Sequence, residues 1–411
     1  MHGQLPVLWR RAEGFQVEDG EGNRWIDFTS SIFVANTGHA PPAVAEALVR
    51  QLSDGPWHTY TYASEIRAEY LERLIALAPS PLGKAWLSTS GSEATECALR
   101  IAKLHGRAAG KRRAGIVTFD GAYHGRTVGA ALMSGTEATR AWMGLNDSTM
   151  VRLPFPYPWT LNGKTGAERA AADLDRLAAG GVDLARDIAA IMLETYQGWA
   201  AAFYPPGYVE TLAEAARKAG ALVMFDDIQA GFGRTGRLFG FQHYDVAPDV
   251  VALGKGISSS LPLAATLARP DLMDLFQTGS MAATHSAHPL CCAAGLANLQ
   301  ALEQGDLVAQ SARRGALMHE RLAALQRRHP DRISHVLGHG LIAAILFRTP
   351  GTDAADPHTP TRACFEALRR GLILVHTGRE SIKIAPPLVI EDDALFEGLD
   401  ALEDAIAAAV D

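Results

Sequence analysis

The feature of this 411-residue chain that most limits its fold is an alternation of short apolar runs with helical patterns from residue 84 onward. This alternation is typical of β-α-β units, which build a mostly parallel sheet. We expect strands at residues 85–87, 115–119, 188–193, 222–225, 250–253 and 263–267, and all but the last lead into polar or glycine-rich turns. The fold class is therefore α/β.

The two ends of the chain have a different pattern, with long helical stretches at residues 307–327 and 392–410. The length also exceeds the usual span of one domain. We predict a large domain at 46–300 and a smaller α+β domain built from the N-terminal segment 1–45 and the C-terminal segment 301–411.

Composition excludes several classes of protein. A net charge of -7 favours no nucleic-acid partner. No apolar run approaches the roughly 18 residues of a membrane span, and Arg10, Arg11 and Glu13 stand where a signal peptide would be apolar. We expect a cytoplasmic protein that does not interact with membranes.

The cysteines and histidines predict no metal centre. Cys97, Cys291, Cys292 and Cys364 show no metal-ligand spacing and are too few for a disulfide framework. His285 and His288 stand three residues apart, but neither has a carboxylate or cysteine neighbour at ligand spacing.

Four strand ends carry unusual chemistry: residues 90–93, 123–125, 226–227 and 254–256. Open α/β sheets bind ligands beyond the carboxyl ends of their strands, so these four ends should converge. Gly91 and Ser92, at a helix start, are suited to a phosphate. The alternative is an ordinary helix N-cap, because Ser90 precedes Glu93 at capping spacing.

Two further ends suggest a planar, nitrogen-containing ligand. Tyr123 and His124 follow a strand, where an aromatic ring could lie flat on a planar group, although packing alone would also explain them. Asp226 and Asp227 point to opposite faces of a strand. A carboxylate that points into the crevice could keep a ring nitrogen protonated, while a helix cap or a salt bridge is the alternative reading.

Lys255 is one of only seven lysines, and it lies between two glycines at the end of an apolar run. Burial lowers the pKa of an amine and makes it a nucleophile toward carbonyls, and the glycines would leave room for a bulky group on it. An exposed loop lysine would have more polar neighbours. Together, the phosphate site, stacking ring, carboxylate and imine-forming lysine describe one cofactor, pyridoxal 5'-phosphate.

Motifs along nearly the whole chain carry a family resemblance: residues 27–39, 88–94, 123–127, 225–236, 253–256, 284–289 and 384–388. The chain resembles the class III (subgroup II) pyridoxal-phosphate aminotransferases, which include γ-aminobutyrate, ornithine and ω-amino acid transaminases and dialkylglycine decarboxylase. The resemblance implies the pyridoxal-phosphate transferase fold type I and a ping-pong Schiff-base mechanism.

The resemblance also implies roles for individual residues. Lys255 and Asp226 would be catalytic, with Lys255 forming the Schiff base and moving the proton, and Asp226 pairing with the ring nitrogen. Thr284 would reach the phosphate of a neighbouring subunit, which implies a homodimer with shared sites, possibly within a higher oligomer. The expected cofactor-binding residues are Gly91, Ser92, Tyr123, His124, Asp226, Gln229, Lys255 and Thr284.

Two departures from the family pattern bear on the substrate. Trp199 stands where the γ-aminobutyrate-like members have a gating glutamate, and Lys383 stands where they have the arginine that binds the α-carboxylate. Lysine lacks the bidentate fork of arginine. With Ile32 and Phe33 as apolar walls, and Arg379 as a second cation, we expect an amine or amino acid donor and a 2-oxo acid acceptor, with pyruvate favoured over 2-oxoglutarate.

Other reactions remain open on the same scaffold. A decarboxylating transaminase like dialkylglycine decarboxylase would release carbon dioxide, and an amino acid epimerase would lose the α-deuteron without net amino transfer. A non-enzymatic regulator that senses the cofactor is disfavoured, because a DNA-binding domain has no room before residue 27.

Overall fold

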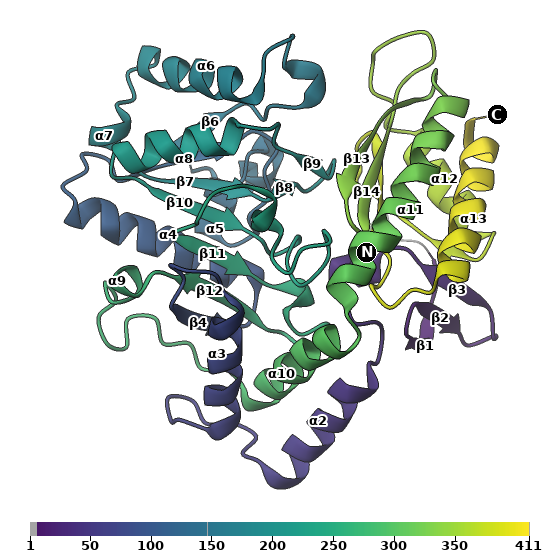
Figure 1. Cartoon of the computed structure of the whole chain (residues 1–411), viewed down its shortest axis with the longest axis horizontal. Helices are drawn as coiled ribbons and strands as arrows, with labels where there is room; N and C mark the ends of the chain where they lie inside the picture. Colours follow the sequence, from purple (N-terminus) through teal and green to yellow (C-terminus); the bar gives the residue numbers. More distant parts are fainter. Residues whose placement is uncertain (1–5, 146, 411) are drawn as a thin grey trace.

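A seven-stranded sheet forms the larger half of the computed structural model, which describes residues 6–145 and 147–410 (Figure 1). Six strands run in parallel, and β12 is antiparallel to both its neighbours. The mostly parallel α/β sheet is therefore confirmed. In sheet order the strands are β4 (Lys84–Ser88), β12 (Ala264–Ala268), β11 (Val250–Leu253), β10 (Leu222–Asp226), β7 (Ile188–Glu194), β5 (Gly115–Phe119) and β6 (Met150–Leu153).

Helices cover both faces of this sheet. Alternate residues of β10 point in opposite directions, so Leu222 and Met224 pack beneath α4 (Gly91–Ala108), whereas Val223 and Phe225 pack toward α8 (Tyr208–Lys218). The remaining helices of this half are α2 (Pro42–Asp54), α3 (Glu65–Leu77), α5 (Val128–Met133), α6 (Gly166–Ala179), α7 (Leu184–Asp187), α9 (Pro270–Met273) and α10 (Pro289–Gln304). None of the helices in the described part of the chain has both the length and the apolar character to cross a bilayer.

Two smaller sheets occupy the other half of the molecule. One has the order β1 (Trp9–Glu13), β2 (Gln16–Asp19), β3 (Arg24–Asp27), β15 (Leu372–Ile373), and the other β13 (Ile333–His339), β14 (Ile342–Phe347), β17 (Ser381–Ile384), β16 (Val375–His376). They lie with α11 (Leu307–Arg328), α12 (Thr359–Leu368) and α13 (Asp392–Val410) (Figure 1). A two-stranded ribbon joins β8 (Tyr196–Gln197) to β9 (Ala202–Phe203).

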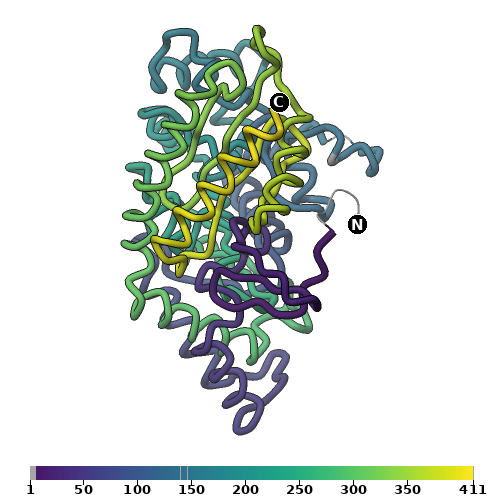
Figure 2. The backbone as a smooth tube through the Cα atoms, turned by 90° about the vertical axis from the view of Figure 1, so that its right-hand side faces the viewer, coloured from purple at the N-terminus to yellow at the C-terminus, as the bar shows by residue number. Residues whose placement is uncertain are grey.

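The two ends of the chain share one of these sheets, because β3 pairs in parallel with β15. Figure 2 shows the N-terminal strands beside the C-terminal helices. The predicted boundaries at residues 45 and 300 fall inside α2 and α10, which pack on each other. The division into 1–45, 46–300 and 301–411 stays a prediction, and residues 1–5 and 411 lie outside the described part.

The short element α1 (Ser30–Phe33) is a left-handed turn made without glycine. Its four residues have φ values of 47°, 52°, 62° and 70°. Each such residue costs about 1 to 2 kcal/mol relative to the right-handed conformation. The turn buries Phe33, while the Ile32 side chain is 49% exposed.

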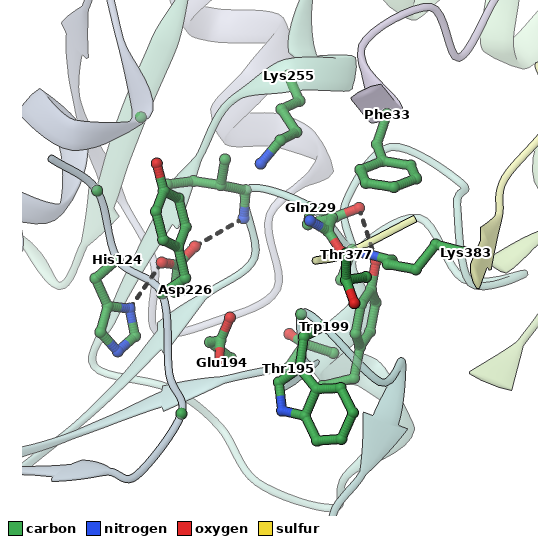
Figure 3. A pocket seen from close by; sticks show the side chains of 18 of the residues that line it. Phe33, His124, Glu194, Thr195, Trp199, Asp226, Gln229, Lys255, Thr377 and Lys383 are labelled. Carbon is green, nitrogen blue, oxygen red and sulfur yellow. Dashed lines mark hydrogen bonds and ion pairs between the residues drawn. The ribbon is translucent and has the colours of Figure 1, made fainter. Parts of the chain in front are cut away.

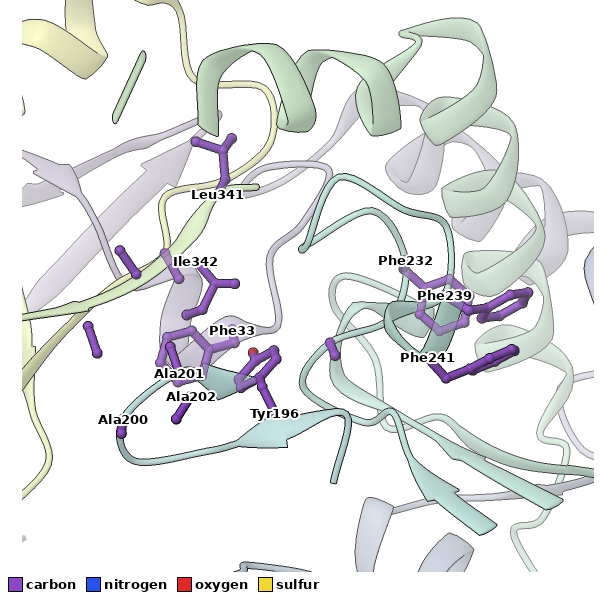
Figure 4. Close-up of a cluster of buried hydrophobic side chains, with 14 of the residues drawn as sticks. Phe33, Tyr196, Ala200, Ala201, Ala202, Phe232, Phe239, Phe241, Leu341 and Ile342 are labelled. Atoms are coloured by element: carbon purple, nitrogen blue, oxygen red, sulfur yellow. The ribbon is translucent and has the colours of Figure 1, made fainter. Parts of the chain in front are cut away.

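Aromatic packing supports the region between the two halves (Figure 4). Phe33 and Tyr196 belong to the same buried cluster as Leu341 and Ile342 of the smaller half. Phe239 stacks on Phe241 with ring centroids 5.6 Å apart. Apolar contact therefore spans the junction, and such contact is the main favourable term in burying it.

Arg234 places a guanidinium at this junction with no exposed surface. Nη1 donates to the carbonyl oxygens of Leu341 at 3.0 Å and Pro386 at 2.5 Å, and Nη2 donates to Ser30 Oγ at 2.9 Å and Asn36 Oδ1 at 2.8 Å. Burial lowers the pKa of Arg234 to about 10, against the opposing effects of Tyr196 and Asp27. One side chain thus connects three segments that are distant in the sequence.

Replacing Arg234 should destabilise the fold. Arg234→Met removes the donors from four buried acceptors, and we expect a loss of about 3 kcal/mol. For a chain of this length that corresponds to about 3 to 4 °C in the thermal midpoint, measured by calorimetry. Arg321→Met, which breaks an exposed pair with Asp400, is the control and should shift the midpoint by under about 1 °C. Equal midpoints for the two variants would contradict this role of Arg234.

Candidate active site

A cavity of about 590 Å³ lies beyond the carboxyl ends of β4, β5, β7, β10 and β11, and the segment from β16 to β17 closes its other side (Figure 3). It therefore lies where the two halves meet. The four unusual strand ends converge here, with an additional one after β7. The predicted site residues that line the cavity are Phe33, Gly91, Ser92, Tyr123, His124, Trp199, Asp226, Gln229, Lys255, Arg379 and Lys383.

Lys255 follows β11 and extends its amine into the cavity (Figure 3). Its backbone is in the left-handed region, with a φ of 46°. Burial lowers the pKa of Lys255, although the charges of Asp226 and Glu194 oppose that effect. A larger fraction of the amine is therefore unprotonated, and so nucleophilic, than for an exposed lysine.

The glycines beside Lys255 have a different reason from the expected one. We expected them to leave room for a group on the amine. A Cβ on Gly256 would lie 2.3 Å from Asn36 Nδ2, and a Cβ on Gly254 would lie 3.1 Å from Ile228 Cγ2. The glycines therefore admit neighbouring side chains that pack around the loop.

Asp226 and His124 form a buried pair on the cavity wall. His124 Nδ1 lies 2.8 Å from Asp226 Oδ2, and Asp226 Oδ1 accepts a hydrogen bond from the Ile228 amide at 3.1 Å. Burial acts to lower the pKa of His124, but the hydrogen bond and charge of Asp226 outweigh it, so the pKa is raised. The histidine therefore contacts the carboxylate that faces the cavity.

Asp227 points the other way, as strand alternation requires. It is fully buried, accepts hydrogen bonds from Thr195 Oγ1 and from the Gly240 amide at 2.8 Å, and does not line the cavity. Burial raises the pKa of Asp227 to about 7. The two adjacent carboxylates therefore have separate environments. Asp227 connects the segments at Thr195 and Gly240, outside the cavity.

The helix start at residues 90–92 has both features considered for its sequence, a helix N-cap and backbone N–H groups suited to a phosphate. Ser90 is the N-cap of α4 and forms a capping box with Glu93. Gly91 and Ser92 occupy the first turn, whose N–H groups have no carbonyl partner within a helix, and both line the cavity. A Cβ on Gly125 would lie 2.4 Å from Ser92 Oγ, so the backbone of Gly125 packs closely against the Ser92 side chain.

Glu194 is a lining residue to which the sequence reasoning gave no role. It is buried, its Oε2 has no hydrogen-bond partner among the described residues, and burial raises its pKa to about 7. Its position could have been found, because Glu194 ends the apolar run 188–193 as Asp226 ends the run 222–225. Thr136, Thr195, Val375, His376 and Thr377 also line the cavity and had no predicted role.

Trp199 forms a fixed part of the cavity wall. Its Nε1 donates to Tyr157 Oη at 2.7 Å, and its carbonyl accepts from Ser381 Oγ at 2.9 Å. The guanidinium carbon of Arg379 lies 3.6 Å from the centroid of the indole ring. Arg379 is half exposed and also contacts Glu380. The aromatic wall formed by Trp199 and the half-exposed cation of Arg379 therefore lie against each other.

Lys383 is buried in β17, with an exposed fraction of 3%, and points into the cavity from the smaller half. Its Nζ donates to Gln229 Oε1 and lies 4.0 Å from the centroid of the Phe33 ring. Burial lowers the pKa of Lys383 well below its usual value, and the charges of Lys255 and Arg234 act in the same direction.

Two predicted residues lie outside the cavity of their own chain. Thr284 is exposed, and its carbonyl accepts from His58 Nε2 at 2.9 Å. Ile32 does not line the cavity either. His58 lies close to His285 and His288, with ring centroids 5.4 Å and 5.7 Å away. Nowhere in residues 6–145 and 147–410 do three or more histidine, cysteine or acidic side chains form a group able to hold a metal ion.

A family model described as aminotransferase class-III matches residues 1–406. The chain belongs to the class III aminotransferases. Among curated relatives of this aminotransferase, the 4-aminobutyrate aminotransferase of Escherichia coli (strain K12) is 34% identical, over 97% of this chain and 93% of the relative. The acetylornithine aminotransferase of Nitrosomonas europaea is 30% identical, over 94% and 91%.

Solved structures of transaminases superpose on this aminotransferase closely. An (S)-enantioselective ω-transaminase from Thermomicrobium roseum has a TM-score of 0.90 and 28% identity, covering 99% of this chain and 93% of that chain. An amine transaminase from an uncultivated Pseudomonas species, solved in the PLP-bound form, has a TM-score of 0.91 and 28% identity, covering 99% and 96%. The fold is fold type I, and the cofactor of this aminotransferase is pyridoxal phosphate.

The residues of the cavity fit this cofactor. A volume of about 590 Å³ is within the usual range for cofactor pockets. The first turn of α4, at Gly91 and Ser92, offers N–H groups to a phosphate. Asp226 would offer a carboxylate to a protonated ring nitrogen, and Lys255 would offer the amine that holds the cofactor.

The two aspartates of this aminotransferase should respond differently to amidation. Asp226→Asn should keep the fold but reduce kcat by at least about a hundredfold, because a neutral amide cannot hold a pyridinium charge. Asp227→Asn should lower the thermal midpoint, since an amide has a single oxygen where the carboxylate accepts from both Thr195 Oγ1 and the Gly240 amide, while kcat stays within about tenfold of wild type. Stopped-flow rates and calorimetry check both. The reverse pattern would mean that Asp227 is the residue at the ring nitrogen.

Proposed function

We propose that this aminotransferase moves an amino group from an amine or ω-amino donor to a small 2-oxo acid, with pyruvate favoured over 2-oxoglutarate. The observation that carries the proposal concerns Trp199 and Lys383, which stand where the γ-aminobutyrate-like members have the gating glutamate and the arginine that binds the α-carboxylate. Both side chains already have partners. Trp199 is held by Tyr157 and by Arg379, and Lys383 donates to Gln229. Among the described residues that line the cavity, Arg379 is then the one guanidinium able to make a forked contact, whereas a dicarboxylate presents two anionic groups.

We assign the roles of the site residues from the family resemblance, and their positions around the cavity support these roles. Bound pyridoxal phosphate supplies an electron-withdrawing ring that stabilises negative charge on a substrate carbon. Lys255 Nζ would hold the cofactor, and as a free amine it would move the proton at that carbon. Asp226, oriented by His124 and the Ile228 amide, keeps the ring nitrogen protonated. Gly91 and Ser92 bind the phosphate, and Tyr123 covers the ring.

The wall of the cavity supports a preference for donors without an α-carboxylate. Phe33 and Trp199 present aromatic surface, and the lowered pKa of Lys383 weakens it as an anion anchor. The name of the Thermomicrobium roseum relative, an ω-transaminase, agrees with this preference. So do the names of the 4-aminobutyrate aminotransferases, because the amino-bearing carbon of 4-aminobutyrate has no carboxylate. Arg379, at the Trp199 ring, is the cation placed to accept the carboxylate of the 2-oxo acid.

We also propose a homodimer in which Thr284 contributes to the site of the neighbouring subunit. The exposure of Thr284, away from the cavity of its own chain, supports this arrangement. Large apolar side chains near it are exposed as well, with Trp57 at 61% and Tyr62 at 78%. Exposed apolar surface of this kind is typical of protein interfaces.

Borohydride should fix pyridoxal phosphate to Lys255. Peptide mass spectrometry after reduction and digestion locates the adduct, and Lys255→Ala should abolish both the adduct and turnover. Lys383, the other lysine that lines the cavity among the described residues, is the internal control. An adduct on Lys383, or on any of the other five lysines, would overturn the assignment.

The donor preference gives a second test of the function. We expect kcat/KM to be lower for glutamate than for alanine or for an amine without an α-carboxylate, with pyruvate as the better acceptor. Lys383→Arg should raise kcat/KM for alanine by about 5- to 30-fold, since a forked contact adds about 1 to 2 kcal/mol. It should leave the amine donor nearly unchanged.

Lys218→Arg, on the exposed side of α8, is the matched control for this substitution and should alter neither rate. A wild-type enzyme that uses glutamate and 2-oxoglutarate as its best pair would refute the proposal. In that case Arg379 or Lys383 binds the substrate carboxylate although the gating glutamate is replaced by Trp199.

A further inference from the structure

Lys383 and Gln229 form a hydrogen bond between two side chains across the cavity, in addition to the hydrogen bond from Ser381 Oγ to the Trp199 carbonyl. Lys383 projects from β17, and Gln229 lies in the turn after β10, 154 positions earlier in the chain. The backbone carbonyl of Gln229 accepts from Tyr196 Oη at 3.3 Å, so the base of this side chain is also held.

The contact determines which way the Gln229 amide faces. The observed contact joins Lys383 Nζ to the amide oxygen of Gln229. In its ammonium form Lys383 has N–H donors and no acceptor, so it can pair only with that oxygen and not with the amide nitrogen. Gln229 Oε1 is therefore turned to Lys383, and Nε2 is left on the opposite side. Figure 3 shows that nitrogen directed to the side of the cavity where Lys255 lies.

The surroundings of Lys383 restrict its movement. Its Nζ lies 4.0 Å from the centroid of the Phe33 ring and 5.9 Å from that of Tyr196, within the range of a cation–π contact. The charged groups that influence it are Lys255, Glu194 and Arg234. The left-handed turn of residues 30–33 fixes Phe33 from one side, and β17 fixes the backbone from the other.

We propose that Lys383 is a positioning residue that holds the Gln229 amide with Nε2 toward the ring oxygen of pyridoxal phosphate, and that it thereby sets the proton affinity of the Schiff base on Lys255. The proposal rests on the roles of Lys255 and Gln229 in the proposed function. It assigns Lys383 an action on the cofactor, through Gln229, that is separate from any contact with a substrate carboxylate.

The direction of the effect follows from hydrogen-bond electrostatics. An N–H donor stabilises negative charge on the ring oxygen. That oxygen then attracts the proton on the adjacent Schiff-base nitrogen less strongly, so the nitrogen loses its proton at lower pH. Without Lys383 the amide is free to rotate, and we expect the nitrogen to keep its proton to higher pH.

The experiment is a pH titration of the visible absorbance of the holoenzyme, in the absence of substrate. Lys383→Met should raise the titration midpoint by about one pH unit, the size expected for one hydrogen bond. Gln229→Ala should raise it by a similar amount. Lys383→Arg retains a donor-only group and should stay near the wild-type midpoint.

The double variant separates positioning from simple charge. If Lys383 acts through Gln229, adding Lys383→Met to Gln229→Ala should give no further shift. If its charge acts through space, the full shift should persist in the Gln229→Ala background, and that result would overturn the proposal. Arg379→Met removes a half-exposed cation that does not contact Gln229, and it should move the midpoint by under about 0.3 pH units.

The outcomes also distinguish this inference from the proposed function. A purified protein with no titrating visible band would refute the proposed role of Lys255. A normal band whose midpoint is unchanged by Lys383→Met would refute the positioning role alone. Lys383→Ala provides the same comparison if Lys383→Met does not fold, because a small side chain leaves space that water can fill.

Discussion

The buried guanidinium of Arg234 is the interaction on which the arrangement of the site depends. A charge without water is costly, and here it is offset by hydrogen bonds to carbonyl, hydroxyl and amide oxygens of segments near residues 30, 36, 341 and 386. Those segments carry Phe33 and Lys383 on one side of the cavity. The loop that contains Arg234 follows directly from Asp226 and Gln229 on the other side, so a single residue links the two walls.

The strained turn at residues 30–33 has its physical explanation in the same network. Asp27 accepts hydrogen bonds from the Thr29 and Ser31 amides, and Ser30 Oγ donates to the Ala385 carbonyl while accepting from Arg234. These contacts offset the cost of left-handed backbone in residues that have a Cβ. The result is a short path from β3 to the cavity wall that presents Phe33 to the Lys383 amine.

Much of the larger half could be predicted from sequence because its information is local. An apolar run followed by a polar turn indicates a strand end, and strand ends of a parallel sheet meet, so Ser92, Tyr123, Asp226 and Lys255 were placed together correctly. The Gln229–Lys383 contact could not be predicted, since it depends on how two separate sheets pack. The turn at residues 30–33 contains no glycine to signal positive φ, and the reason for Gly256 depends on Asn36, 220 positions earlier.

The stacking of Arg379 on Trp199 has a consequence for how the entrance of the site responds to its surroundings. An ion pair between a guanidinium and a carboxylate weakens with added salt and disappears when the carboxylate is protonated. An indole has no proton to gain in that range, and an exposed cation–π contact is worth only about 0.5 to 1 kcal/mol. Arg379 has one contact of each kind, because its Nε also lies 3.3 Å from Glu380 Oε2. Added salt therefore weakens its ion pair with Glu380 and leaves its contact with the Trp199 ring nearly unchanged.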